Sequence, residues 1–373
     1  MNAVGSSPEL PYWRFPRSLD ELSQVAEQAL EPRERYEEAS LDGGRASWIK
    51  DAIAVTQFAG SGILYQNAGK KAAANNEVTP PLAGAPLVKL HDPLIIVPGW
   101  GTFPSKFDHL KDQLLAGGQN GERAVYLKDG QAFADKACSR ATEVAPSDRV
   151  FIAVFDSPLD APDSSAPQLK EALALVKKGV SEKVDLLGYS MGGLATRKML
   201  DDGTTRVDQV ALLGTANKGT RFATLAEYII HRDINWAMSL GGINAAHLPA
   251  MGWLKSWDPE RPESNPNLDA LNKTLDRQLA GASEFLSVAA TGYSTLTRTW
   301  GGGSGGDGLV PASSTSLEGI PSALLPGRGN KHHGNLPHDK DVFSRLADYF
   351  GWSQVGEASP PPSADLQAAG TAR

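Results

Sequence analysis

A serine in the middle of the chain has the setting of a reactive nucleophile. Residues 184–187 form a short apolar run typical of a buried strand, and a helix-forming run begins at Leu194. Between them, Gly188, Ser190 and Gly192 give the pattern G-x-S-x-G. Glycines flank the serine in such a turn because a Cβ would not fit, and the hydroxyl is left exposed above the sheet. The pattern therefore predicts that Ser190 is a nucleophile, with helix N–H groups directed at a developing oxyanion.

A serine hydroxyl needs a general base, and that base needs an acid to orient it. After a turn of this kind, the acid and then the histidine follow the serine along the chain. Asp307, which ends a glycine-rich loop, is the candidate acid, although an aspartate before a glycine is also common in plain turns. Three histidines compete as the base, and the residue types alone do not separate His332, His333 and His338.

An oxyanion beside Ser190 needs two backbone N–H donors. Met191, the residue after the nucleophile, is expected to supply one of them. The other is expected from the loop 99–101, which follows the apolar run 94–97, and Trp100 is our candidate there. The glycines on both sides of it allow the backbone to approach a substrate closely.

Two other ligand classes do not fit these late segments. The glycine-rich run 301–306 lacks the Lys-Ser/Thr ending of a P-loop and does not open a helix after a strand. A metal site at His332 and His333 is disfavoured because adjacent side chains point apart and no acidic or cysteine ligand brackets them at ligand spacing. We therefore expect neither a metal nor a cofactor.

Composition narrows the class of protein. The 373 residues are 41% hydrophobic and 21% charged, which is typical of a globular protein with a full core. A net charge of -7 argues against a nucleic-acid partner, which would need a basic surface. One cysteine, Cys138, cannot form a disulfide within the chain. With no secretory signal and no bilayer-length apolar span, we expect a soluble protein, cytoplasmic or exported by a signal-independent route.

Short apolar strands alternate with helices from residue 87 onward. The expected strands are 94–97, 124–127, 150–155, 184–187, 207–213 and 285–290. Helices are expected over 107–115, 166–180 and 341–350. Buried strands bridged by helices predict an α/β fold with a mostly parallel sheet and helices on both of its faces.

The flanking segments set the predicted domain boundaries. Residues 1–86 are expected to form a helical extension, with one helix starting at Leu19 and another at Ser47. The α/β domain is expected over 87–352. A disordered tail rich in Pro, Ala, Ser and Gly is expected over 353–373.

Within the α/β domain, the strand signal lapses over about 220–280. This mostly apolar segment carries Trp236, Met251 and Trp253, and is expected to be a helical cap or lid over the site. Exposed aromatic and methionine side chains there would allow transient contact with a lipid interface. An ordinary helical insert that packs on the sheet is the open alternative.

Four motifs resemble those of bacterial lipases of the α/β-hydrolase superfamily, including related GPI inositol-deacylases and lecithin–cholesterol acyltransferases. Residues 183–194, K-V-D-L-L-G-Y-S-M-G-G-L, resemble the family's K-V-[DN]-L-[VI]-G-H-S-M-G-G-L. Residues 213–220, L-G-T-A-N-K-G-T, resemble L-G-T-P-x-x-G-[ST]. Residues 307–311 resemble the acid loop D-G-[LV]-V, and residues 333–336 resemble the base loop H-x-x-[LM]. The last motif selects His333 as the base.

The resemblance covers residues 93–350 and implies an α/β-hydrolase fold with a Ser190–His333–Asp307 triad. The implied activity is hydrolysis of carboxylic esters, of acyl glycerides or other apolar esters, with no obligate protein partner. A phospholipase or acyltransferase with the same triad stays open, as do a peptidase and a non-catalytic lipid-binding protein that keeps the elbow as scaffold.

Three residues depart from the family pattern, and none of them removes a catalytic group. Tyr189 stands where the family usually has His, and Ala216 stands where it has Pro. The family's His-Gly on the oxyanion strand is Pro98-Gly99 here, which supports Trp100 by position.

Overall fold

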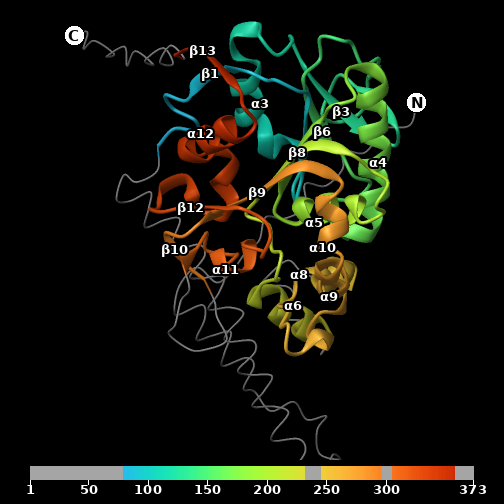
Figure 1. Cartoon of the computed structure of the whole chain (residues 1–373), viewed down its shortest axis with the longest axis vertical. Helices are drawn as coiled ribbons and strands as arrows, with labels where there is room; N and C mark the ends of the chain where they lie inside the picture. Colours follow the sequence, from blue (N-terminus) through green and yellow to red (C-terminus); the bar gives the residue numbers. More distant parts are fainter. Residues whose placement is uncertain (1–78, 232–244, 296–304, 358–373) are drawn as a thin grey trace, which may run out of the picture.

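The computed structural model of the protein describes residues 79–231, 245–295 and 305–357 (Figure 1). The helices predicted from Leu19 and Ser47 lie outside these residues, as does the tail beyond 357. Trp236 of the predicted cap also lies outside them. Within the described ranges, no helix combines the length and the apolar character needed to cross a membrane.

A nine-stranded sheet forms the centre of the structure, in the order β12-β9-β8-β7-β2-β6-β3-β4-β5. In chain order the strands are β2 (Leu94–Val97), β3 (Ala124–Lys128), β4 (Gln131–Phe133), β5 (Ala141–Thr142), β6 (Val150–Ala153), β7 (Asp185–Tyr189), β8 (Val207–Leu213), β9 (Ala282–Ala290) and β12 (Ser322–Leu325). Every neighbouring pair from β12 to β3 is parallel, and β4 and β5 continue the sheet antiparallel. The mostly parallel sheet predicted from the sequence is therefore confirmed.

Helices cover both faces of this sheet (Figure 1). On one face, α3 (Asp108–Leu115) and α12 (Lys340–Tyr349) pack in one cluster with alternate strand residues such as Leu94 and Ile96. On the other, α4 (Pro162–Gly179) and α5 (Met191–Leu200) pack with Ile95 and Val97. Strands buried on both sides appear in the sequence as continuous apolar runs. Burial of each such side chain lowers the free energy of the folded state by about 1.5–3 kcal/mol.

The segment between β8 and β9 is helical in its described part. It contains α6 (Arg221–His231), α8 (Leu248–Leu254), α9 (Pro266–Lys273) and α10 (Leu275–Leu279), with short 3-10 turns at Ala245–His247 and Pro262–Ser264. Figure 1 shows α6, α8 and α9 grouped at one end of the molecule, beyond the edge of the sheet. Their apolar side chains form a cluster of their own that also takes in the start of α5.

Short elements carry the loops that lead to α12. They are β10 (Tyr293–Ser294), β11 (Gly305–Gly306), α11 (Ala312–Thr315) and the 3-10 turns Gly329–Lys331 and His333–His338. Two further 3-10 turns, Pro104–Phe107 and Ala116–Gly118, flank α3. β10 and β11 pair antiparallel, immediately before Asp307. The small ribbon thus brings the end of the glycine-rich loop back to the carboxyl end of β9.

A second ribbon joins the two ends of the α/β domain. β1 (Pro86–Lys89) pairs antiparallel with β13 (Ser353–Glu357), so the prediction that the tail begins at Ser353 is wrong for residues 353–357. Composition is misleading here because backbone pairing to β1 holds this strand. It is also anchored by Trp352, which is buried and stacks on Phe350 with ring centroids 5.4 Å apart.

Candidate active site

Ser190 lies in a sharp turn between β7 and α5. Its backbone has φ 55° and ψ -126°, a left-handed conformation that few residues other than glycine adopt. A Cβ on Gly188 would lie 2.6 Å from the Cα of Gly193, and one on Gly192 would lie 2.3 Å from the carbonyl oxygen of Val97. Both positions therefore require glycine, which is the physical reason for the G-x-S-x-G pattern.

The neighbouring strands fix this turn from two sides. The Ser190 N–H donates to the carbonyl oxygen of Leu213, at the end of β8, over 2.9 Å. On the other side, Gly99 lies just after β2 and packs against Ser190. A Cβ on Gly99 would lie only 2.7 Å from the Ser190 Cβ. The position of the Ser190 hydroxyl is therefore set by the backbone of three adjacent strands.

The structure brings the three predicted side chains together. His333 Nε2 lies 3.0 Å from Ser190 Oγ, and His333 Nδ1 lies 2.6 Å from Asp307 Oδ2. The other Asp307 oxygen, Oδ1, accepts the N–H groups of Leu309 and Val310 at 3.0 and 2.7 Å. Because Asp307 is only 2% exposed and held at both oxygens, its carboxylate has one orientation, the one that faces the imidazole.

Two contacts hold His333 itself. Its backbone N–H donates to the carbonyl oxygen of Asp307 over 2.8 Å, which joins the acid loop to the base loop. The Tyr189 hydroxyl donates to the His333 carbonyl oxygen over 2.7 Å, and the two rings stack with centroids 5.4 Å apart. Tyr189 was noted in the sequence only as a departure from the family pattern, since nothing local connects residues 144 positions apart.

The two other candidate histidines make contacts away from the serine. The His332 ring packs edge-on against Tyr293, with centroids 5.3 Å apart. His338 Nε2 hydrogen-bonds to the carbonyl oxygen of Lys106 over 2.7 Å, which requires a proton on that nitrogen. Burial lowers the pKa of His338 from its usual value and favours the neutral ring. His333 is thus the one of the three that reaches both Ser190 and Asp307.

Both candidate oxyanion donors border the serine. Met191 is the first residue of α5, so its N–H has no acceptor within the helix. A Cβ on Gly99 would lie 3.3 Å from the Met191 nitrogen, so the loop that carries Trp100 passes beside the start of α5. The Gly101 N–H donates to the carbonyl oxygen of Pro158 over 2.7 Å and holds this loop in place.

Apolar side chains surround the serine on the side of the insert. Met191 and Leu194 of α5 form one cluster with Val310 of the acid loop and with insert residues that include Met251 and Trp253. These two insert side chains were expected to be exposed, but Met251 is 0% and Trp253 3% exposed. They are buried because the insert packs directly on the first turn of α5.

The insert also contacts the oxyanion loop. The ring of His247, just before α8, packs edge-on against the Trp100 ring, with centroids 5.5 Å apart. Trp100 packs against the same apolar cluster as the insert helices. The described part of the insert therefore borders the nucleophile and both candidate oxyanion donors.

A buried arginine ties the nucleophile helix to its surroundings. Arg197 of α5 is 0% exposed, and its guanidinium donates to the side-chain oxygens of Gln278, Asn217 and Asn272 at 2.9, 3.0 and 2.8 Å. Burial lowers the pKa of Arg197 to about 9. Arg197 was not among the residues predicted from the sequence, although a charged side chain within the apolar helix-forming run was a visible signal.

Taken together, these features define the fold. A strand–turn–helix elbow carries the serine at the carboxyl edge of a parallel sheet, and the acid and base come from later loops in the order Ser, Asp, His. This is the arrangement of the α/β-hydrolase fold.

No protein-family model matches the chain, and no curated protein matches it. Among solved structures, the mature form of the lipase BlEst2 from Bacillus licheniformis is 15% identical, with a TM-score of 0.46 over 73% of this chain and 95% of that one. The lin2722 product of Listeria innocua is 18% identical, with a TM-score of 0.44 over 69% and 92%. Phospholipase PlaB from Legionella pneumophila is 15% identical, with a TM-score of 0.42 over 70% and 63%.

Proposed function

We propose that the protein is a serine carboxylic ester hydrolase that acts on apolar acyl esters. The observation that carries this proposal is the position of His333, with Nε2 3.0 Å from Ser190 Oγ and Nδ1 2.6 Å from Asp307 Oδ2. A hydroxyl within hydrogen-bond reach of an oriented imidazole can lose its proton as it attacks a carbonyl carbon.

In the acylation step, Ser190 Oγ forms a bond to the acyl carbon while its proton passes to His333 Nε2. The carbonyl oxygen becomes an oxyanion, which the N–H groups of Met191 and Trp100 stabilise. Asp307 keeps Nδ1 protonated and stabilises the imidazolium. When the intermediate collapses, the bond to the leaving alcohol breaks and His333 returns the proton to the alcohol oxygen.

In the deacylation step, water takes the place of the alcohol. His333 removes one proton from the water as its oxygen bonds to the acyl carbon, and a second oxyanion forms at the same two N–H groups. Collapse breaks the bond to Ser190 Oγ, which recovers its proton from His333, and releases the carboxylic acid. Both steps use the same groups, so the same site could transfer the acyl group to a second alcohol in place of water.

The surroundings of the serine support an apolar acyl group. Met191 directly follows Ser190 and belongs to an apolar cluster with Leu194 and Val310, and the ring of Trp100 packs against the same cluster. An acyl chain that packs against this apolar surface would leave water for an apolar environment, at about 0.8 kcal/mol for each methylene buried. Apolar acyl groups are therefore preferred over charged ones.

The test compares the wild-type protein with Ser190→Ala on p-nitrophenyl esters of short and long acyl chains. We expect the variant to lose at least about 10³-fold in kcat, because the nucleophile is gone. Ser164→Ala is the matched control, since Ser164 is an exposed serine on α4. A fluorophosphonate probe should label wild type and the control but not Ser190→Ala.

Chain-length preference then distinguishes the substrate classes. Preference for long chains indicates a lipase, and preference for short chains indicates an esterase. Hydrolysis that survives Ser190→Ala contradicts the assigned triad. A folded wild-type protein that neither hydrolyses esters nor reacts with the probe contradicts the proposal and favours a non-catalytic lipid-binding protein.

A further inference from the structure

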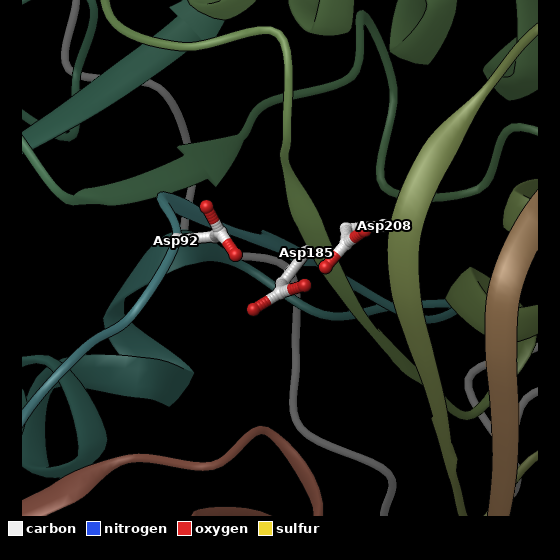
Figure 2. A group of neighbouring side chains, drawn as sticks. All are labelled: Asp92, Asp185 and Asp208. Carbon is white, nitrogen blue, oxygen red and sulfur yellow. The ribbon is translucent and has the colours of Figure 1, made fainter.

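Three aspartates meet at the edge of the sheet opposite the serine. Asp92 precedes β2, Asp185 begins β7 and Asp208 is the second residue of β8. Because β2, β7 and β8 are parallel neighbours, their amino ends lie at one edge, whereas Ser190 follows the carboxyl end of β7. Figure 2 shows these three side chains close together, with Asp185 between the other two. This cluster takes no part in the proposed ester hydrolysis.

The spacing of the carboxylates fits a divalent cation. One oxygen from each residue can be chosen so that all three lie within 4.8 Å of one another. Oxygens bind Ca²⁺ at roughly 2.3–2.6 Å, so two ligands on opposite sides of the ion are up to about 5 Å apart. The corresponding limit for Mg²⁺ is only about 4.2 Å, because its ligands lie at about 2.1 Å. Ca²⁺ therefore fits the whole range of these separations.

A second observation, independent of the spacing, is an orphaned oxygen. Asp185 is 1% exposed, and its Oδ1 accepts the Gln209 N–H over 3.1 Å. Its Oδ2 is buried and hydrogen-bonds to no group in the described chain. Buried polar atoms in folded proteins nearly always have a partner, and a carboxylate oxygen without one is especially costly. A bound cation would supply this atom with the partner that the described chain does not.

The nearby cationic side chains do not supply that charge. His91 Nδ1 lies 2.8 Å from Asp92 Oδ2, but the ring is 71% exposed. Lys183 Nζ lies 3.8 Å from Asp208 Oδ1 and is 64% exposed. Neither forms an ion pair with Asp185. Burial, reinforced by the charges of Asp92 and Asp208, raises the pKa of Asp185 to about 7, as expected for an acid without a counter-charge.

We propose that Asp92, Asp185 and Asp208 bind one Ca²⁺ ion that joins the amino ends of β2, β7 and β8. Carboxylate oxygens are the ligands that this hard cation prefers. The Asp208 side chain is 19% exposed, so water can reach the ion and complete its coordination. The site stabilises the sheet and is separate from the triad, and it differs from the expectation of no metal drawn from the sequence.

The test is calcium titration of the full-length protein after removal of metals with EDTA. Calorimetry should show one Ca²⁺ per chain, with a dissociation constant on the order of 0.1 mM. Excess calcium should raise the melting temperature by about 5 °C relative to EDTA. Asp185→Asn should weaken binding at least tenfold and remove the calcium-dependent shift. Asp129→Asn is the matched control, because Asp129 is exposed and has a φ of 51° that asparagine tolerates.

Asp185→Asn removes repulsion between carboxylates, so the variant should melt in EDTA at or above the wild-type temperature. That result would show that the variant has lost calcium binding and not its fold. Esterase activity should not depend on calcium at a temperature where both forms are folded. The proposal is overturned if calcium neither binds nor shifts the melting temperature, since the cluster then holds a proton instead. It is equally overturned if Asp185→Asn binds as wild type does, or if Mg²⁺ binds more tightly than Ca²⁺.

Discussion

At the scale of single residues, the position of the base depends on groups that never touch the substrate. The Tyr189 hydroxyl holds the carbonyl of His333, and the Tyr189 ring stacks on the imidazole. A side chain without the phenol hydroxyl would lose the first of these two contacts. We therefore propose that Tyr189 positions His333, which a substitution can test.

Tyr189→Phe keeps the ring and removes only the hydroxyl. The lost hydrogen bond is worth about 1 kcal/mol, so we expect kcat to fall about fivefold while KM changes little. Tyr349→Phe is the matched control, because the Tyr349 hydroxyl donates to the Val210 carbonyl oxygen over 3.1 Å, away from the triad. Steady-state kinetics on one ester measure both. Equal losses in the two variants would show that the effect is general destabilisation.

Gly214 lies against two members of the proposed triad, so we expect the triad to depend on it. It has φ 58°, and an added Cβ would lie 2.8 Å from Leu336 Cδ1 and 3.2 Å from Asp307 Oδ2. Gly214→Ala should therefore displace the acid and reduce kcat about 10²-fold or more. Gly118→Ala carries similar backbone strain, at φ 70°, with no atom within 4 Å of the Cβ. Kinetics that show the same activity for both variants would contradict this role.

At the scale of elements, the base loop is held by a histidine whose burial favours the neutral ring. His338 ends the 3-10 turn His333–His338 and bonds to the Lys106 carbonyl. Its pKa is lowered by burial, and the neighbouring Lys106 and His109 charges act in the same direction. Below the usual histidine pKa of about 6.5 the unfolded chain binds a proton that the folded chain resists. This residue therefore lowers the free energy of unfolding as the pH falls.

His338→Gln removes the titration and keeps an N–H donor for the Lys106 carbonyl. The melting temperature of the variant minus that of wild type should thus be more positive at pH 5 than at pH 8. Thermal unfolding followed by circular dichroism at the two pH values measures it. A difference that does not change with pH would mean that His338 is protonated equally in both states.

Features that depend on neighbouring residues could be predicted from the sequence, and contacts between distant residues could not. The turn at Ser190 was predictable because sterics of a few adjacent residues dictate it, and the strands because burial on both faces makes each one a continuous apolar run. The bond from Tyr189 to His333 and the amide partners of Arg197 were not predictable, because they join residues far apart in the chain. The choice of His333 needed a family motif, and the structure now gives it a geometric reason.

At the scale of the whole molecule, the two ends of the parallel strands carry different groups of polar side chains. The carboxyl edge carries Ser190 and its partners, where parallel sheets place their reactive loops. The amino edge carries Asp92, Asp185 and Asp208, which three separate strands bring together. A cluster of this kind leaves no local pattern in the sequence, which is why these three residues were not singled out there. The β1–β13 ribbon escaped prediction for the same reason, because its stability comes from pairing between distant segments.

We expect the β1–β13 ribbon to contribute to the stability of the whole domain. β13 joins β1 by antiparallel pairing and continues from Trp352, whose ring packs on Phe350 and Phe343 of the core. Deleting residues 353–373 leaves β1 unpaired, so the melting temperature should fall by about 3 °C or more, which corresponds to roughly 1 kcal/mol in a domain of this size. Deleting only 358–373 keeps β13 and should leave the melting temperature unchanged. Ester hydrolysis at 25 °C should be equal in both, because the ribbon touches none of the triad. If the two truncations melt together below the full chain, the loss comes from residues beyond β13, and the ribbon is not what closes the domain.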